Sequence, residues 1–195
     1  MPRVSKAEAE KNRAIIEQVS SRLFREQGFH GISVADLMGA AGLTHGGFYG
    51  HFESKDALAA IACTRAFEES EARWRKRVGE APDHATALSS LIDGYLSARN
   101  RNNAGAGCPV AALANDVARE SDDKPVRAAF HQGLEALVDI LTDVQPDAAA
   151  DARRSAALAQ MATLAGALIL SRATQGTPLS NEILAATRAR LLPEG

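Results

Sequence analysis

Residues 33 to 58 constrain the fold of this chain more than any other stretch, because they place two short helices around a tight turn. Ser33, with an acidic residue three positions later, has the pattern of a capping box that starts a helix, and Gly42 ends that helix. Thr44 is expected to cap a second, very short helix, and Ser54 a much longer one. The stretch therefore predicts a helix–turn–helix unit joined directly to a long helix.

A short helix held rigidly against another has a shape that fits the major groove of DNA. The distribution of charge gives weaker support for this hypothesis. Residues 1–79 contain 12 Lys and Arg against 10 Asp and Glu, whereas residues 80–195 contain 10 against 14. The net charge of −2 excludes a strongly basic chain, so the asymmetry agrees with nucleic-acid binding but does not establish it.

The rest of the chain has the pattern of helices, with no convincing strand and no internal repeat. Apolar residues recur at helical spacing both before Gly28 and after residue 54, whereas the composition of residues 100–107 predicts a loop. We therefore expect an all-α protein of about nine helices. Residues 1–54 would form a three-helix DNA-binding head, and residues 55–195 a helical bundle for ligand binding and dimerisation.

Residues 150–173 are expected to form a helix that is apolar on nearly all sides in its second half. Such a helix has to be buried on all sides, so we expect it and the next helix to pack against a second copy of the chain, forming a homodimer. The alternative is a central helix in a monomeric bundle. The apolar run, residues 156–170, is interrupted by Gln160 and Thr163 and is shorter than the ~20 residues of a membrane span, so no membrane partner is expected.

The sequence offers little that supports catalysis. It contains no Cys/His cluster with metal spacing, no phosphate-binding glycine loop and no recognisable acid–base pair, and His84 and His131 are isolated. We expect no metal, no cofactor and no enzymatic activity. The two cysteines, Cys63 and Cys108, are too far apart in sequence to suggest a disulfide scaffold, and the first residues lack the apolar core of a signal peptide. A cytoplasmic, bacterial protein is expected.

The stretch from residue 28 to 58 resembles the tetracycline-repressor (TetR/AcrR) family of bacterial transcription regulators. The resemblance is carried by the pattern Gly-Leu-Thr-x-Gly-x-x-Tyr-x-His-Phe-x-Ser-Lys-x-x-Leu, which starts at Gly42, and by Gly28-Phe29 and Ser33-Val34 before it. It implies a homodimer that binds pseudo-palindromic double-stranded DNA and leaves it when a small molecule binds. It covers about a quarter of the chain, and beyond it only length and helix count agree.

Several residues of this stretch are candidates for contacts with DNA phosphates. Ser33 and Thr44 lie at helix N-termini, which attract anions, although their hydroxyls would serve equally as caps. The resemblance assigns a phosphate contact to Tyr49. Lys55 is a further candidate anchor, and His51 would be either a donor to phosphate or a packing residue.

The glycines of the expected recognition helix set it apart from the family pattern. Gly50 replaces a larger side chain that many relatives carry, so little is left there to contact base edges. His45 is the best candidate for a base contact, and the backbone at Gly46 and Gly47 would approach the DNA closely instead. The operator sequence therefore cannot be inferred from the resemblance.

A ligand pocket is expected on the inward faces of the body helices, with plain core packing as the alternative for each residue. Few charged residues are expected on those faces, and the charged run of residues 68–77 has the pattern of a solvated helix face, so a small apolar inducer of unknown identity is predicted. The candidate ligand contacts are Phe67, Trp74, Tyr95, Cys108, Leu113, Val117, Phe130 and Leu134.

Cys108 suggests an alternative mode of control. It precedes Pro109 at an expected helix N-terminus, a position that lowers a thiol pKa and raises its reactivity. The chain would then be a regulator that senses oxidants or electrophiles through Cys108; the alternative is a small buried apolar residue. Two other classes are alternatives: an enzyme or binding protein with an incidental helix–turn–helix, and an architectural DNA binder without sequence preference. The absence of a catalytic set disfavours the first, and the weak basic balance of residues 1–79 the second.

Overall fold

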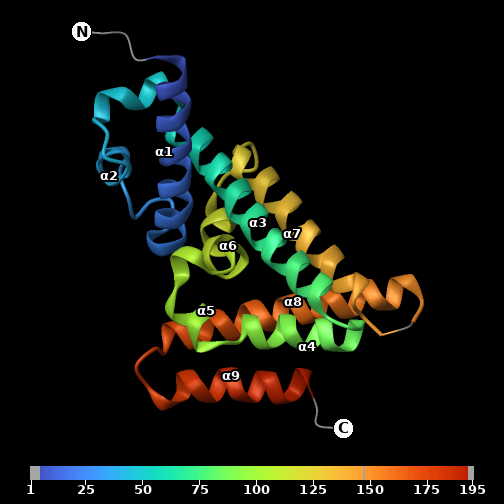
Figure 1. Cartoon of the computed structure of the whole chain (residues 1–195). Helices are drawn as coiled ribbons and strands as arrows, with labels where there is room; N and C mark the ends of the chain where they lie inside the picture. Colours follow the sequence, from blue (N-terminus) through green and yellow to red (C-terminus); the bar gives the residue numbers. More distant parts are fainter. Residues whose placement is uncertain (1–4, 147, 193–195) are drawn as a thin grey trace.

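The computed structural model describes residues 5–146 and 148–192. Within these ranges the chain forms α-helices and two short 3-10 helices and no strand, which confirms the expected all-α class (Figure 1). We call residues 5–54 the head and residues 55–192 the body. The elements are α1 (Lys6–Gln27), α2 (Val34–Ala40), η1 (His45–Gly50), α3 (Lys55–Glu80), α4 (His84–Tyr95), α5 (Ala98–Asn102), η2 (Ala104–Ala106), α6 (Pro109–Arg119), α7 (Pro125–Asp143), α8 (Ala150–Ala173) and α9 (Pro178–Leu191).

Local sequence signals set the ends of the head helices. Ser33 and Asp36 form the predicted capping box: the Ser33 hydroxyl accepts from the Asp36 backbone N–H at 3.2 Å, and the Asp36 carboxylate accepts from the Ser33 N–H at 3.1 Å. Ser54 caps α3 by accepting a backbone N–H at 3.1 Å. Gly28 ends α1 with a φ of 74°, a left-handed conformation that other residues adopt at a cost.

The short element after the turn departs from the expectation in two respects. η1 is a 3-10 helix, and Thr44 has the backbone conformation of an N-cap but makes no side-chain cap hydrogen bond, so the predicted capping by its hydroxyl is wrong. Three glycines in six residues weaken helix propensity, each by about 1 kcal/mol. Phe48 holds η1 in place: it is fully buried and its ring lies 5.7 Å from that of Phe52.

In the body, α3 and α7 pack side by side (Figure 1). Gly133 on α7 permits their close approach, because a Cβ there would lie 2.1 Å from the Phe67 ring of α3. The Phe67 ring also meets the Phe130 ring edge to face, with centroids 5.3 Å apart. This contact places two of the predicted ligand contacts in the α3–α7 core.

Residues 100–107 are not the irregular loop that their composition suggests. They contain the end of α5 and all of η2, and the Asn103 side chain caps η2 by accepting a backbone N–H at 3.1 Å. Arg172 of α8 fixes this segment by donating to the carbonyls of Asn100 at 3.0 Å and Arg101 at 3.2 Å. Asn103, a residue type that favours loops, therefore acts here as a helix cap.

α8 presents a continuous apolar stripe to solvent in the single chain. Leu158 and Leu170 are 48% and 56% exposed, and Ala162 and Gly166 continue the four-residue spacing between them. A Cβ at Gly166 would meet nothing within 4 Å. By length and composition α8 could also cross a membrane, but that is weak evidence, because a core helix of a soluble protein has the same properties.

Candidate functional site

The surface of η1 exposes most of the residues predicted to contact bases or phosphates. Thr44, His45, Gly46 and Gly47 are exposed, and the hydroxyl of Thr44 makes no hydrogen bond within the described residues. Tyr49 is 70% exposed, although its ring packs edge to face on the buried Phe48 ring, 5.2 Å away. The phenol is therefore positioned by the head core but remains available to a partner.

Of the three other predicted phosphate contacts, Ser33 and Lys55 already make side-chain hydrogen bonds within the described residues, and His51 does not. The hydroxyl of Ser33 lies 2.5 Å from the Asp36 carboxylate, and this hydrogen bond lowers the pKa of Asp36. The Lys55 ammonium is half-buried and donates to the Ile32 carbonyl at 2.5 Å, which joins α3 to the loop before α2. His51 is half-buried, and its ring makes no hydrogen bond within the described part of the chain.

Arg13 of α1 anchors the end of η1, a role that the sequence pattern does not predict. Its guanidinium donates to the His51 carbonyl at 2.5 Å and lies over the Phe52 ring, 4.6 Å from the centroid. It also pairs with Glu17 at 2.9 Å. The four-residue spacing of Arg13 and Glu17 is typical of an ordinary surface ion pair, so no sequence signal marks the contact with η1.

A cavity of about 270 Å³ lies in the body between α3, α4 and the segment from α5 to the start of α6. It brings together three of the predicted ligand contacts: Trp74 of α3, Tyr95 of α4 and Cys108 at the N-cap of α6. The other five do not line it and pack in or against the body core. These are Phe67, Leu113, Val117, Phe130 and Leu134.

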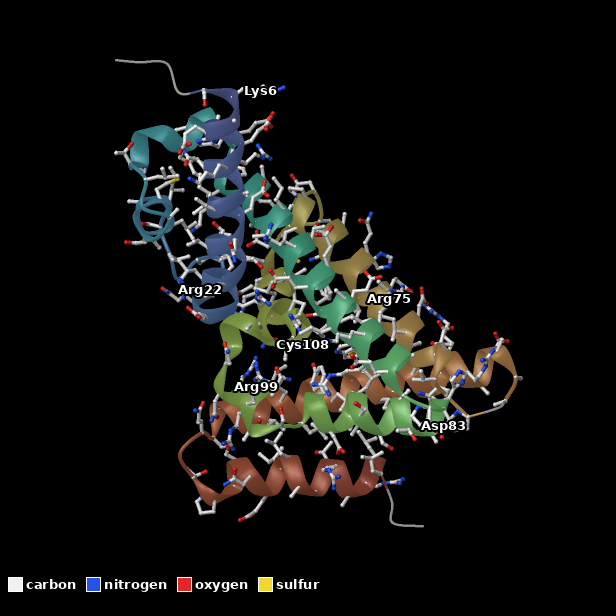
Figure 2. The ribbon with its side chains drawn as sticks, viewed as in Figure 1. Lys6, Arg22, Arg75, Asp83, Arg99 and Cys108 are labelled. Atoms are coloured by element: carbon white, nitrogen blue, oxygen red, sulfur yellow. The ribbon has the colours of Figure 1, made fainter. Side chains whose placement is uncertain are left out.

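Three arginines line the cavity, so the expectation of few charged residues there is wrong. Arg73 and Arg77 come from α3, one helical turn apart, and Arg99 comes from α5. Arg75, between the first two in sequence, instead pairs with Glu71 at 2.8 Å on the outer surface (Figure 2). Arg73 and Arg77 are exposed like Arg75, but they line the cavity and Arg75 does not, and no pattern within α3 distinguishes them in the sequence.

Cys108 does not have the environment of a reactive thiol. It sits at the predicted helix N-terminus but is only 5% exposed. Burial raises the pKa of the Cys108 thiol and outweighs the lowering by the Tyr95 hydroxyl and the first backbone N–H groups of α6. The helix start does lower this pKa, as predicted, but the predicted net lowering is wrong because burial has the larger effect. Burial also raises the pKa of Cys63, to about 12.

Both parts of the chain match known protein families. Residues 16–61 match the family described as bacterial regulatory proteins, tetR family, and residues 84–181 match the C-terminal domain of LmrA/YxaF-like transcriptional regulators. The chain is also 30% identical over 168 residues to an uncharacterized HTH-type transcriptional regulator of Mycobacterium tuberculosis, covering 80% of this chain and 82% of that protein. The chain belongs to the TetR family of transcription regulators.

Shorter matches and solved structures agree with this assignment. The TetR-family chain is 41% identical over 58 residues to the regulator AcrR of Shigella flexneri, which is 30% of this chain and 27% of AcrR. It is 27% identical over 74 residues to the repressor KstR2 of Rhodococcus jostii, which is 38% of this chain and 36% of KstR2. These two matches span well under half of either relative.

The fold of the TetR-family chain is similar to that of Escherichia coli NemR in its reduced form, with a TM-score of 0.78, 18% identity and coverage of 93% and 95%. A TetR-family regulator of Agrobacterium tumefaciens gives a TM-score of 0.77, 24% identity and coverage of 94% and 97%. Members of this family are DNA-binding transcription regulators.

Proposed function

We propose that this chain is a homodimeric, sequence-specific repressor that a small molecule, bound in the body cavity, releases from a pseudo-palindromic operator. The observation that carries the proposal is the path of α6. Its N-cap, Cys108, lines the cavity, and its last residues touch the head, so a change at the cavity can move the head. A ligand acts through such a path only if it binds the two positions of the head with different affinity.

The contacts of α6 with the head are close and specific. The His30 ring nitrogen lies 2.8 Å from the Glu120 carboxylate at the end of α6. A Cβ at Gly28 would lie 2.6 Å from the Asp116 carboxylate of α6, so the end of α1 is packed directly on this helix. A shift of α6 would therefore also displace the end of α1.

A second link joins the head to the cavity wall itself. Arg25 of α1 is buried and donates to the Gly107 carbonyl at 3.1 Å, directly before Cys108, and to the Glu69 carboxylate at 3.0 Å. The head is thus connected both to the start of α6, through Arg25, and to its end, through Glu120. A ligand that displaces the 107–108 segment would act on both links.

The exposed stripe of α8 supports the homodimer. Leu158 and Leu170, with Ala162 and Gly166 between them, would be covered by the same stripe of a second copy, as a two-fold axis requires. Two heads would then enter successive major grooves about 34–36 Å apart. In this arrangement residues 1–54 form the DNA-binding domain and residues 55–195 the ligand-binding and dimerisation domain.

In the proposed complex the exposed groups of η1 make the principal contacts. The Thr44 hydroxyl and the Tyr49 phenol would bind phosphates, His45 would contact a base edge, and the backbone at Gly46 and Gly47 would approach the DNA. Ser33, His51 and Lys55 would contribute phosphate contacts at the edge of this surface, Ser33 and Lys55 in addition to their structural hydrogen bonds. Phosphate contacts position the head, and base contacts supply sequence preference.

The proposal is tested by selecting binding sites from random double-stranded DNA with the purified full-length protein. We expect one palindromic sequence to be enriched, and Thr44→Val to weaken binding to it several-fold, because the Thr44 hydroxyl has no role inside the head. Thr64→Val, at an exposed position of α3, is the matched control and should change nothing. Enrichment of no sequence, or equal loss in both variants, would contradict the proposal.

The same selected site tests the thiol alternative. The buried Cys108 with its raised pKa argues against a fast sensor of oxidants. We therefore expect binding to survive mild peroxide treatment in both the parent protein and Cys108→Ser. Loss of binding in the parent alone would instead establish a thiol switch at Cys108.

A further inference from the structure

The arginines of the cavity carry positive charge that no neighbouring acid neutralises. The residues that line the cavity include Arg73, Arg77 and Arg99 but no Asp or Glu, and none of these three forms an ion pair within the described residues. Arg73 donates to the Ser70 hydroxyl at 2.8 Å and Arg77 to the Ser90 carbonyl at 3.0 Å, both neutral acceptors. Several guanidinium donors are thus left for a further partner.

The surroundings of the cavity add to this positive charge. The acid that acts most directly on Arg73 is Glu69, and its carboxylate is already 3.0 Å from the buried Arg25. Burial, and then Arg25 and Arg77, lower the pKa of Arg73. An anion in the cavity would relieve this repulsion, whereas an apolar ligand would displace water and leave the charges less solvated.

Two neighbouring residues of α4, Gly94 and Tyr95, shape the polar part of the cavity wall. A Cβ on Gly94 of α4 would lie 2.3 Å from a guanidinium nitrogen of Arg77, so the absence of a side chain at this position leaves room for Arg77. The buried Tyr95 hydroxyl faces the Cys108 thiol and meets no other polar partner among the described residues. It is available as a neutral donor or acceptor to a ligand.

The apolar part of the lining is aromatic. The rings of Trp74 and Tyr95 meet edge to face with centroids 6.1 Å apart, and both residues are buried. The volume of about 270 Å³ lies just below the range of roughly 300–1,000 Å³ typical of drug-sized ligands, so a small molecule is expected. The planar fork of an arginine matches a carboxylate with two parallel hydrogen bonds.

We infer that the body cavity binds a small aromatic carboxylate, with its carboxylate on Arg73, Arg77 and Arg99 and its ring against Trp74 and Tyr95. The inference rests on the proposed function, in which this cavity holds the ligand that controls DNA binding, and it replaces the apolar inducer expected from sequence. In Figure 2 Arg99 and Cys108 lie near each other in the body, where α5 leads into α6, so the anion would sit beside the segment that connects to the head.

The test uses the full-length protein without DNA and the fluorescence of Trp74, the single tryptophan of the sequence. The probes are benzoate, phenylacetate and 3-phenylpropanoate, each with its neutral primary amide, and inorganic phosphate. We expect at least one carboxylate to change the emission saturably and its amide to bind at least roughly tenfold more weakly, as the loss of charged hydrogen bonds implies. Amides that bind as well, saturation by no carboxylate, or phosphate that binds equally well would overturn the inference.

Variants identify the residues responsible. Arg77→Gln and Arg99→Gln should each weaken the carboxylate about tenfold or more, Arg77→Lys should weaken it less, and Gly94→Ala should weaken it by displacing Arg77. Arg75→Gln, on the same helix but facing solvent, is the matched control. Equal loss in Arg75→Gln would contradict the assignment. Melting curves identify any variant that fails to fold. If Arg77→Gln or Arg99→Gln fails to fold, Arg77→Lys and Gly94→Ala still test whether Arg77 binds the carboxylate.

The titration without DNA separates this inference from the proposed function. Carboxylate binding by a protein that enriches no DNA site would support the ligand class and refute the repressor. An enriched palindrome that the bound carboxylate does not release would refute control by this ligand. Enrichment of a palindrome by a protein that binds none of the carboxylates would support the repressor and refute the aromatic carboxylate as its ligand.

Discussion

η1 carries no lysine or arginine, whereas the cavity in the body is lined by three arginines. η1 presents hydroxyl, phenol, imidazole and bare backbone, and the cavity presents three guanidinium groups, themselves exposed, beside two buried aromatic rings. Charge is therefore concentrated where a small molecule would bind and not on the element expected to read DNA. Affinity for an operator would depend on precise placement of neutral groups, which makes the rigidity of the head important.

The largest effect is expected from removing the side chain that positions η1. Phe48 is fully buried, so Phe48→Ala should lower the free energy of unfolding by about 3–5 kcal/mol. It should abolish binding to the selected operator while the carboxylate titration at Trp74 stays unchanged below the melting temperature. Chemical unfolding, gel-shift titration and fluorescence measure the three quantities.

Phe67→Ala in the body is the matched control for Phe48→Ala. Phe67 is 3% exposed and should lose a similar amount of stability. Below its melting temperature this variant should keep operator binding, because Phe67 does not touch η1. If Phe48→Ala bound the operator as well as Phe67→Ala does, the head would not depend on the aromatic packing of η1.

A smaller effect is expected where the two regions are joined. Arg25→Met removes a buried guanidinium and leaves the Gly107 carbonyl without its hydrogen bond, which should cost about 1–3 kcal/mol of stability. The variant should still bind the operator and the carboxylate separately, but the carboxylate should release the operator less effectively. Arg75→Met, whose side chain pairs only at the surface, should change stability by less than about 0.5 kcal/mol and leave release intact. Normal release in Arg25→Met would show that the link through Gly107 is dispensable.

Two of the three caps predicted from local sequence in the head are present, at Ser33 and Ser54 but not at Thr44, whereas the features that depend on packing were not predicted. Both caps follow from residues within one turn of the helix start. The orientation of Arg73 and Arg77 depends on where α4 and α5 lie against α3, which no periodicity within α3 reveals.

The pKa of Cys108 likewise depends on packing that the sequence pattern does not reveal. Its position at a helix N-terminus was predicted from Pro109, but the sign of its pKa shift was wrong because burial by distant residues outweighs the helix end. Arg13 is a further case, since its contact with the His51 carbonyl joins residues 38 positions apart. Sequence patterns thus located the helices that carry the sites but did not predict the charge and burial of the side chains that line them.

The smallest expected effect is also the most informative about η1. Gly46 and Gly50 do not have positive φ, and a Cβ at either position would meet nothing within 4 Å, so alanine fits both without strain. Gly46→Ala and Gly50→Ala should each stabilise the free protein by about 0.4–1 kcal/mol, measured by chemical unfolding, because alanine narrows the unfolded ensemble.

The two variants should differ only when DNA is present. If the backbone at Gly46 approaches the DNA, the added methyl group has no space there, and Gly46→Ala should bind the operator more weakly although it is more stable. Gly50→Ala, at the end of η1, should bind as the parent does. A stabilised variant that binds more weakly cannot owe its defect to misfolding, so the difference between these two methyl groups would locate the closest approach of the head to DNA. Equal operator affinity in both would instead leave DNA binding to the side chains of Thr44, His45 and Tyr49.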